Sequence, residues 1–327
     1  MTKSGNILSG MRPTGRLHMG HYSVLENWAK LQNEYPCYFF IADWHAITTA
    51  FDNTSIIAQN IRDIALDWLA AGLDPDKCHI FVQSQVKEHA ELHLLFSMIT
   101  PLSWLERVPT YKGQLAAFAE KGKDIATYGF LGYPLLMAAD ILMYRPVGVP
   151  VGQDQLPHVE FCRELVRRFH HLYDVNIFPE PAPIFSQITI LPGTDNRKMS
   201  KSYNNYINLS DPPEVIKQKV WGMVTDPARI RKTDPGHPEV CAVYAYQGFY
   251  NKEKQAEICA NCTKGTIGCG ECKKMLTDKI NAFLDPIREK RAYYENNPQI
   301  LDEIIDDGNR AARKVACETM EMVREAM

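Results

Sequence analysis

Two short runs of the sequence carry the residue types that bind and neutralise phosphate groups. They are His18-Met19-Gly20-His21 and Lys198-Met199-Ser200-Lys201-Ser202. Imidazole N–H groups donate to phosphate oxygens, and lysine is a mobile point charge suited to a polyphosphate whose charge shifts during a reaction. Each run alone also fits an exposed helix start or a basic surface loop. Together, in this order, they indicate an enzyme that opens ATP between its α- and β-phosphates to activate a carboxylate.

The first run lies between a predicted strand and a predicted helix. Asn6–Met11 is expected to form the strand and Arg12–Gly15 a turn, after which apolar residues recur at helical spacing. Because the first N–H groups of a helix are unpaired, His18 and His21 lie where anions bind, and Gly20 leaves space for a flat base. The polar stretch Gly193–Arg197 predicts that the lysine run lies on a loop able to close over a substrate.

The first half of the chain alternates strand and helix patterns. Cys37–Ala42 and His79–Val82 are short, apolar and rich in aromatic and β-branched residues, which is typical of buried strands. An amphipathic helix is expected between them, beginning near Asn53-Thr54 and ending at Gly72. The strand–helix–strand unit predicts an α/β fold with a Rossmann-like, doubly wound parallel sheet that binds ligands at the carboxyl ends of its strands.

Helical patterns dominate from Pro212 onward. We expect breaks at Asp226-Pro227, Asp234–Gly236 and Asp285-Pro286, and a final amphipathic helix that contains Ala312, Val315, Ala316, Met320 and Val323. The sequence therefore predicts a catalytic domain over residues 1–208 and an all-helical domain over residues 209–327.

Composition bounds the class of protein. The chain has 327 residues, 45% hydrophobic and 23% charged, which is ordinary for a globular protein. There is no apolar run of membrane-spanning length and no signal peptide, so a cytoplasmic location without membrane association is expected. A net charge of −3 does not indicate a nucleic-acid binder, so any RNA contact must use local basic groups. The candidates are Arg163, Arg167 and Arg168; Arg229, Arg231 and Lys232; and Arg288, Lys290 and Arg291.

Several longer blocks extend the two phosphate motifs. They are Ser9–Gly15, Ala42–Ala46, Tyr133–Leu142, Val149–Gln155 and Thr225–Arg229. With these blocks the chain resembles the class I aminoacyl-tRNA synthetases, and among them the bacterial-type tryptophanyl-tRNA synthetase family, over nearly its whole length. The resemblance implies activation of tryptophan with ATP to tryptophanyl-adenylate and transfer to tRNA(Trp). Alternatives are a tyrosyl-tRNA synthetase, a nucleotidyltransferase that joins ATP to a small acid, and a non-catalytic RNA-binding or metal-sensing relative.

The resemblance also implies roles for individual residues and partners. His18, His21, Lys198, Lys201 and Lys112 are expected to act on the phosphates. Gly20, Gly152, Asp154, Met199 and Ser200 are expected to contact ATP. Mg²⁺ should accompany ATP without a dedicated protein cage. The helical domain is expected to bind the tRNA anticodon, and the protein to be a homodimer.

A pocket for tryptophan needs an acceptor for the indole N–H inside an apolar box. Asp140 follows an apolar run and can accept that hydrogen bond, and Met137 lies one helical turn earlier, where its thioether could contact the ring. The resemblance adds Tyr133 and Gln155 for the α-amino group, with Ser9 and His45 bordering the amino acid. At position 12 many members have glutamine. Here it is Arg12, so we do not assign it the role of that glutamine.

Nine cysteines are present, and five of them cluster in the helical region. Cys259, Cys262, Cys269 and Cys272 form two C-x-x-C pairs with glycines between them, and Cys241 precedes them. In a cytosolic protein this pattern indicates metal binding rather than disulfides. The other four, Cys37, Cys78, Cys162 and Cys317, lie on apolar stretches and are expected in the core.

Two kinds of metal site fit the spacing. A tetrahedral Zn²⁺ site would use Cys259, Cys262, Cys269 and Cys272. A [4Fe–4S] cluster would use Cys241, Cys262, Cys269 and Cys272, with Cys259 as an alternative ligand. The resemblance favours the cluster, because a subset of tryptophanyl-tRNA synthetases carries one on cysteines spaced C-x₂₂-C-x₆-C-x₂-C. Here the first gap is twenty residues, so the metal and one ligand stay open.

Overall fold

The computed structural model describes residues 3–185 and 191–327, without the side chain of Ser202. It divides into two compact units. Unit 1 comprises Met1–Gly15, Glu26–Gln187 and Asn297–Met327, and unit 2 comprises Arg16–Leu25 and Ile188–Asn296. The sequence predicted one cut near residue 208. The units differ from that prediction because the last helix packs on the sheet of unit 1, while the histidine run packs with the later segments of unit 2.

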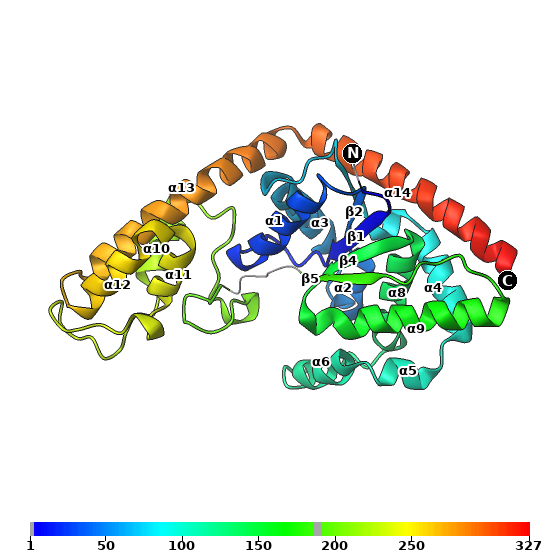
Figure 1. The fold of residues 1–327 in the computed structure, drawn as a ribbon, viewed down its shortest axis with the longest axis horizontal. Helices are drawn as coiled ribbons and strands as arrows, with labels where there is room; N and C mark the ends of the chain where they lie inside the picture. Colours follow the sequence, from blue (N-terminus) through cyan, green and yellow to red (C-terminus); the bar gives the residue numbers. More distant parts are fainter. Residues whose placement is uncertain (1–2, 186–190) are drawn as a thin grey trace. The chain divides into compact units, whose positions relative to one another are not determined.

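Unit 1 is built on a five-stranded parallel sheet with strand order β3-β2-β1-β4-β5 (Figure 1). The strands are β1 (Asn6–Met11), β2 (Cys37–Ile41), β3 (Cys78–Val82), β4 (Pro146–Val151) and β5 (Ala182–Phe185). In the register, Ile7 lies opposite Cys37 and Cys37 opposite Cys78. The predicted parallel α/β sheet and its first three strands are confirmed; β4 and β5 were not predicted.

Helices cover both faces of the sheet. On one face, Trp28 of α1 (Tyr22–Leu31) stacks on Phe39 with ring centroids 4.6 Å apart and meets Trp68 of α3 (Ile57–Ala70) edge-on. The other face packs against α4 (Glu88–Ile99), α8 (Tyr133–Met143), α9 (Leu156–Tyr173) and α14 (Pro298–Ala326). This two-sided burial explains the continuous apolar character of β2 and β3. The remaining helices of unit 1 are α2 (Asp43–Ala50), α5 (Leu102–Glu106), α6 (Pro109–Ala119) and α7 (Tyr128–Leu131).

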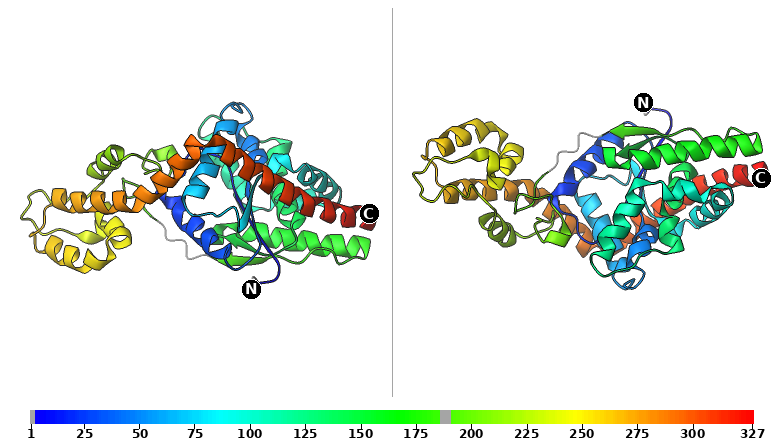
Figure 2. Two further views of the ribbon diagram at one scale, coloured as in Figure 1. Left: turned by 90° about the horizontal axis from the view of Figure 1, so that it is seen from above. Right: turned by 90° about the horizontal axis from the view of Figure 1, so that it is seen from below.

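The last helix, α14, closes the outer edge of the sheet at β3 (Figure 2). Gly308 allows the two backbones to touch, since a Cβ there would lie 1.9 Å from the carbonyl oxygen of Ile80. The next side chain, Asn309, accepts a hydrogen bond from the Val82 N–H at 2.9 Å. The amphipathic helix predicted around Ala312 is therefore confirmed, but its apolar face belongs to the core of unit 1.

Unit 2 is helical in its described part, apart from two isolated bridges, His18 with Asn208 and Pro192 with Lys198. Its helices are α10 (Pro213–Trp221), α11 (Ala242–Tyr250), α12 (Gln255–Thr263) and α13 (Cys269–Asn296). The helix break predicted at Asp285-Pro286 is wrong, because α13 continues through Pro286. The flanking Leu284 and Ile287 are buried, and we attribute the continuity to this packing, which outweighs the one backbone hydrogen bond that proline removes.

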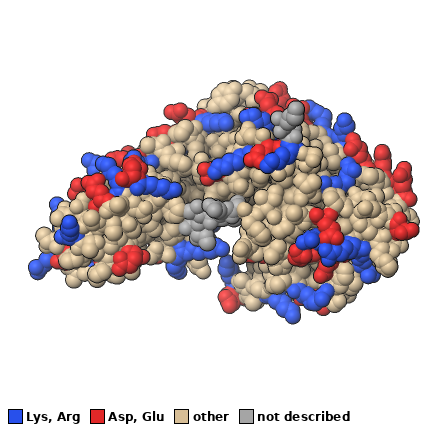
Figure 3. Space-filling model, in the orientation of Figure 1, with Lys and Arg blue, Asp and Glu red and all other residues tan. Residues whose placement is uncertain are grey.

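Basic and acidic side chains are interspersed on the visible face of each unit (Figure 3). Much of the predicted basic surface is already paired: Arg163 and Arg167 share Glu180, and Arg288 bonds Asp285. None of the helices among the described residues combines the length and hydrophobicity needed to cross a membrane.

Candidate active site

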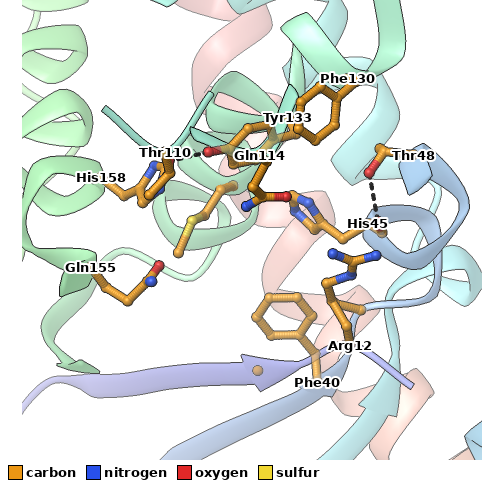
Figure 4. Close-up of a pocket in the computed structure, with 13 residues that line it drawn as sticks. Arg12, Phe40, His45, Thr48, Thr110, Gln114, Phe130, Tyr133, Gln155 and His158 are labelled. Atoms are coloured by element: carbon orange, nitrogen blue, oxygen red, sulfur yellow. Dashed lines mark hydrogen bonds between the residues drawn. The ribbon is translucent and has the colours of Figure 1, made fainter. Parts of the chain in front are cut away.

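Unit 1 contains a pocket of about 280 Å³ at the carboxyl ends of β1 and β2 (Figure 4). This is the edge at which a parallel sheet was expected to bind ligands. Helices α2, α6, α7, α8 and α9 supply most of its walls. The lining residues are Gly10, Arg12, Phe40, Ala42, His45, Thr48, Thr110, Gln114, Phe130, Tyr133, Met137, Gln155 and His158.

A chain of three polar side chains stiffens one wall of this pocket. The Tyr133 hydroxyl bonds the Thr110 hydroxyl, which lies 3.1 Å from His158 Nε2. Burial raises the pKa of Tyr133. Burial also lowers the pKa of His158 to about 4, helped by the nearby His45, so this imidazole is neutral at pH 7. The wall therefore offers hydrogen-bonding groups without formal charge.

Asp140 lies beneath the pocket and is fully buried. His45 Nε2 lies 3.0 Å from its Oδ2, His89 Nδ1 lies 2.6 Å from its Oδ1, and the Gln83 amide donates to both oxygens at 2.9 and 2.7 Å. His89 also bonds the Tyr144 hydroxyl at 2.8 Å. Burial alone would raise the pKa of Asp140, but the bonds from His45 and His89 outweigh it and hold the pKa at about 2. The carboxylate is ionised, and these contacts occupy about four acceptor positions.

The structure brings together four of the six residues expected around tryptophan. Met137, Tyr133, Gln155 and His45 line the pocket. Among the described residues, the lining includes neither Asp140 nor Ser9. Asp140 is covered by His45, and the Ser9 hydroxyl points toward the carbonyl oxygen of Pro150 at 3.4 Å.

In unit 2, the two histidines of the first motif lie together at the entry of α1, as predicted. A 3₁₀ turn, Met19–His21, leads into that helix. The rings of His18 and His21 are 3.8 Å apart, and the His18 N–H donates to His21 Nδ1 at 3.3 Å. Burial, with Lys201 nearby, lowers the pKa of His18 to about 3 and of His21 to about 4. Both rings are therefore neutral donors at pH 7 rather than cations.

The lysine motif packs beside these histidines within unit 2. A Cβ on Gly20 would lie 3.4 Å from Met199 Sδ, and Lys198 is exposed. Asn205 holds the loop: its amide accepts from the Ser200 N–H at 2.8 Å and donates to Asp195 and to the Lys198 carbonyl at 2.7 and 3.1 Å. The two motifs therefore lie side by side in unit 2. The sequence analysis did not identify Asn205 as the residue that shapes the loop.

Three other residues expected near ATP lie in unit 1. Lys112 is exposed on α6, outside the pocket lining. Gly152 precedes the 3₁₀ turn Gln153–Gln155 after β4. Asp154 is exposed and accepts from the Gln155 amide at 2.8 Å. Their expected roles remain predictions.

Four cysteines of unit 2, Cys241, Cys262, Cys269 and Cys272, line one small pocket and form what we name the cysteine cluster. Cys259 is not part of this lining. Arg229 Nη1 lies 3.6 Å from Cys262 Sγ and 3.9 Å from Cys269 Sγ. A Cβ on Gly236 would lie 2.6 Å from Cys262 Sγ. Within the described residues, however, no three His, Cys, Asp or Glu side chains are arranged to hold a metal ion.

Sequence reasoning missed part of the pocket and of the cysteine cluster. Thr110, Gln114 and His158 have no motif around them, and only the fold brings them to the same pocket as Tyr133. Arg229 was grouped with basic surface residues, yet its guanidinium donates to the carbonyls of Lys232 and Ile267 beside the cysteines. The arginine in the family-like block Thr225–Arg229 was the available signal.

Comparison with known proteins gives a consistent result. The model of the family described as tRNA synthetases class I (W and Y) matches residues 2–285. The tryptophan–tRNA ligase of Thermotoga maritima is 52% identical over 98% of both chains. That of Aquifex aeolicus is 44% identical over 98% of this chain and 99% of its own.

A solved structure agrees with these sequence relatives. The crystal structure of tryptophanyl-tRNA synthetase from Campylobacter jejuni, complexed with ADP and tryptophan, superposes with a TM-score of 0.89 at 34% identity. The similarity covers 98% of each chain. The tyrosyl-tRNA synthetase of Archaeoglobus fulgidus, at 20% identity and a TM-score of 0.63, shares the fold.

Proposed function

The chain belongs to the class I tRNA synthetases of the W and Y group, and from its two sites we propose which residues bind tryptophan and which bind ATP. The enzyme activates tryptophan with ATP to tryptophanyl-adenylate and transfers the tryptophanyl group to tRNA(Trp). The observation that carries the choice of tryptophan is the 52% identity to a tryptophan–tRNA ligase over 98% of both chains.

The reaction has two balanced steps. A carboxylate oxygen of tryptophan attacks the α-phosphorus of ATP, and the bond to the β-phosphate oxygen breaks to release pyrophosphate. A hydroxyl of the terminal adenosine of tRNA then attacks the acyl carbon, losing its proton, and AMP leaves. Neither step needs a covalent enzyme intermediate, so the protein acts by positioning and by stabilising charge.

In our proposal the pocket of unit 1 binds tryptophan, and Asp140 recognises the indole N–H. The acceptor positions of Asp140 are already used, so the indole has to replace one donor. His45 is the donor that it replaces, because His45 lines the pocket and makes the longest of the four contacts, at 3.0 Å. His89 and Gln83 keep the carboxylate ionised and oriented during this exchange. Tyr133 and Gln155 offer oxygen atoms to the α-ammonium group.

The test is amino-acid-dependent exchange of labelled pyrophosphate into ATP, with tryptophan, tyrosine and the benzothiophene analogue of tryptophan run in parallel. In the analogue sulfur replaces the N–H. The wild type should use tryptophan in preference to both, and Asp140→Asn should lose most of the preference over the analogue. The control Asp76→Asn changes an exposed carboxylate of the same unit and should retain the preference for tryptophan over the analogue. An equal preference in wild type and Asp140→Asn would remove Asp140 from indole recognition.

In unit 2, we assign the neutral rings of His18 and His21 to hydrogen bonds with the phosphates of ATP. Lys198 and Lys201 supply the positive charge that stabilises pyrophosphate as it leaves. Gly20 leaves space for the adenosine, since a Cβ there would lie 3.0 Å from the His18 ring and 3.4 Å from Met199 Sδ. Mg²⁺ would arrive on the phosphates of ATP, as is usual for nucleotide sites. Roles for Lys112, Gly152 and Asp154 at the nucleotide rest on resemblance.

We also propose that the cysteine cluster holds a [4Fe–4S] group on Cys241, Cys262, Cys269 and Cys272. The shared pocket supports this set over the one with Cys259. Arg229 supports it as well, because a nearby guanidinium favours thiolates, the form that binds metal. A bound cluster would cross-link the segment before α11 with helices α12 and α13. These thiolates are in unit 2, whereas the tryptophan pocket is in unit 1, so we assign the group a structural or tRNA-contacting role.

Anaerobic purification followed by measurement of iron, sulfide and zinc per chain tests the cluster. The wild type and Cys259→Ser should contain iron and sulfide, and Cys241→Ser should contain little. Stoichiometric zinc that survives Cys241→Ser but not Cys259→Ser would establish the zinc site instead.

Two partners complete the proposal. Unit 2 exposes Arg231, Lys232 and Lys290, which we assign to tRNA phosphates, so tRNA binding should weaken as salt rises.

In unit 1, Leu94 and Met98 of α4 and Leu102 of α5 are 54%, 69% and 65% exposed. We assign this apolar surface to a homodimer contact. Sedimentation equilibrium of the wild type and Met98→Glu tests it: a dimer that the charge dissociates is expected, and an unchanged dimer would place the contact elsewhere.

A further inference from the structure

Arg12 is a half-buried cation in the tryptophan pocket without an anionic partner. Its Nη2 donates to the Thr49 hydroxyl, and its Nε is buried with no hydrogen-bond acceptor. Among the described residues, no ion pair joins Arg12 to a carboxylate. A guanidinium has five N–H donors, so most of the bonding capacity of this side chain is unused. Figure 4 shows the guanidinium beside the His45 ring, on the pocket wall that also carries Thr48.

The other polar groups of the pocket do not neutralise this charge. Thr48, Thr110, Gln114 and Gln155 are uncharged, and Asp140 is covered by His45 and already bonded. The lowered pKa of His158 and the raised pKa of Tyr133 leave both groups neutral at pH 7. The pocket lining therefore carries a guanidinium that no carboxylate contacts, in a partly desolvated place. Such a charge is costly unless a ligand compensates it.

We propose that Arg12 binds the α-carboxylate of tryptophan and so makes this pocket selective for an amino acid over an indole amine. The inference rests on the proposed function, because the pocket has to be the tryptophan site. A zwitterionic amino acid offers a carboxylate to Arg12, and its ammonium goes to the oxygen atoms of Tyr133 and Gln155. The planar guanidinium fits a carboxylate by two parallel N–H···O bonds, which a glutamine amide cannot reproduce.

The Thr49 hydroxyl explains how the guanidinium keeps its direction. Thr49 is buried on α2, and its single bond to Nη2 fixes one end of the fork. Nη1 makes no hydrogen bond within the described residues, so its donors stay available for a ligand, whereas Nε is buried. If the role of Arg12 were to hold the fold together, these donors would be expected to have protein acceptors, as buried polar groups generally do.

The experiment compares equilibrium binding of tryptophan and of tryptamine, which lacks the carboxylate, by dialysis with labelled ligand in the absence of ATP. Arg12→Gln should weaken tryptophan binding by roughly 10- to 100-fold, the effect of one charged hydrogen-bonded contact. The same variant should bind tryptamine as well as the wild type does or better, because a cation that repels the amine is gone. Arg12→Lys should show an intermediate loss for tryptophan and no gain for tryptamine.

Controls separate this effect from loss of folding. Arg107→Gln removes an exposed arginine of unit 1 and should change neither ligand. Without ligand, Arg12→Gln should melt no lower than the wild type, since a partly desolvated charge without a counter-ion has been removed. If Arg12→Gln does not fold, the tryptophan-to-tryptamine ratio of Arg12→Lys decides.

Two results would overturn the inference. Equal weakening of both ligands by Arg12→Gln would make Arg12 structural. Unchanged tryptophan binding by Arg12→Gln would show that Arg12 does not bind the carboxylate. If ATP affinity is lost at the same time, Arg12 would be assigned to the nucleotide. Failure of the proposed function is recognised separately, by a wild type that shows no tryptophan-dependent pyrophosphate exchange.

Discussion

Acidification should remove a defined part of the stability of unit 1 through Asp140. The pKa of this carboxyl lies at about 2 in the folded protein, below the ordinary value of 3.8. A group with a depressed folded pKa stabilises the fold above its unfolded pKa, and this stability is lost as the pH falls toward the folded pKa. The contribution of Asp140 should therefore be complete at pH 6 and decline below pH 4.

The magnitude follows from the size of the shift. At about 1.4 kcal/mol for each unit of pKa, ionised Asp140 contributes about 2 kcal/mol at neutral pH, and about half of it remains at pH 3. The contribution comes from the bonds with His45 and His89, which outweigh the cost of burial. The amide introduced by Asp140→Asn does not titrate between pH 6 and pH 3. As the pH is lowered, the free energy of unfolding of this variant should therefore fall less steeply than that of the wild type.

The assay is urea unfolding followed by tryptophan fluorescence, at intervals from pH 6 to pH 3. Unit 2 contributes one of the five tryptophans, Trp221, and the other four lie in unit 1. In a Trp221→Phe background the signal therefore reports on unit 1 alone. The difference in unfolding free energy between the wild type and Asp140→Asn, both in this background, should shrink by about 1 kcal/mol between pH 6 and pH 3. A difference that is constant with pH would show that the carboxylate is not held ionised by its neighbours.

Three further outcomes are expected. Lys198→Ala and Lys201→Ala should each lower the rate of pyrophosphate exchange by roughly 10²- to 10³-fold. Tryptophan affinity measured without ATP should stay unchanged, because both lysines lie in unit 2 and the tryptophan pocket lies in unit 1. A parallel loss of tryptophan affinity would contradict this. Asn205→Ala should lower kcat for exchange more than it raises the KM for tryptophan, since it releases the lysine loop; unchanged kcat would exclude the amide as the loop's support. Gly308→Ala should destabilise unit 1 by about 3 kcal/mol or more in the fluorescence assay, because its Cβ would lie 1.9 Å from the Ile80 oxygen; a smaller loss would show that α14 shifts easily.

The sequence predicted those features that follow from local periodicity. The first three strands, the helix entry at the histidines and the amphipathic C-terminal helix were all recognisable, because each shows its own pattern of apolar residues. Strand β4 was not, because Pro146, Gly148 and Pro150 disfavour a strand locally. The pairings of β4 with both β1 and β5 overcome that preference, and no local pattern contains such information.

The site was predictable in its residue types and less so in its contacts. Met137 and Asp140 were placed on one helix by their spacing, but the sequence contains no sign that His45, His89 and Gln83 surround the carboxylate. These partners come from separate segments that meet only in the packed core. In the same way, the spacing of the cysteines left two ligand sets open. In the structure Cys241, Cys262, Cys269 and Cys272 line one pocket, and Cys259 is not part of its lining.

The helix that seals the outer strand of the sheet has a consequence for biosynthesis. Pro298–Ala326 is translated after every other described segment of unit 1, so the backbone groups of β3 have no cover while the ribosome is still at work. An uncovered outer strand can pair with a second nascent chain. A product truncated before Gly308 keeps that hazard permanently. Chains that lack this helix should therefore aggregate or be degraded more readily than chains that contain it.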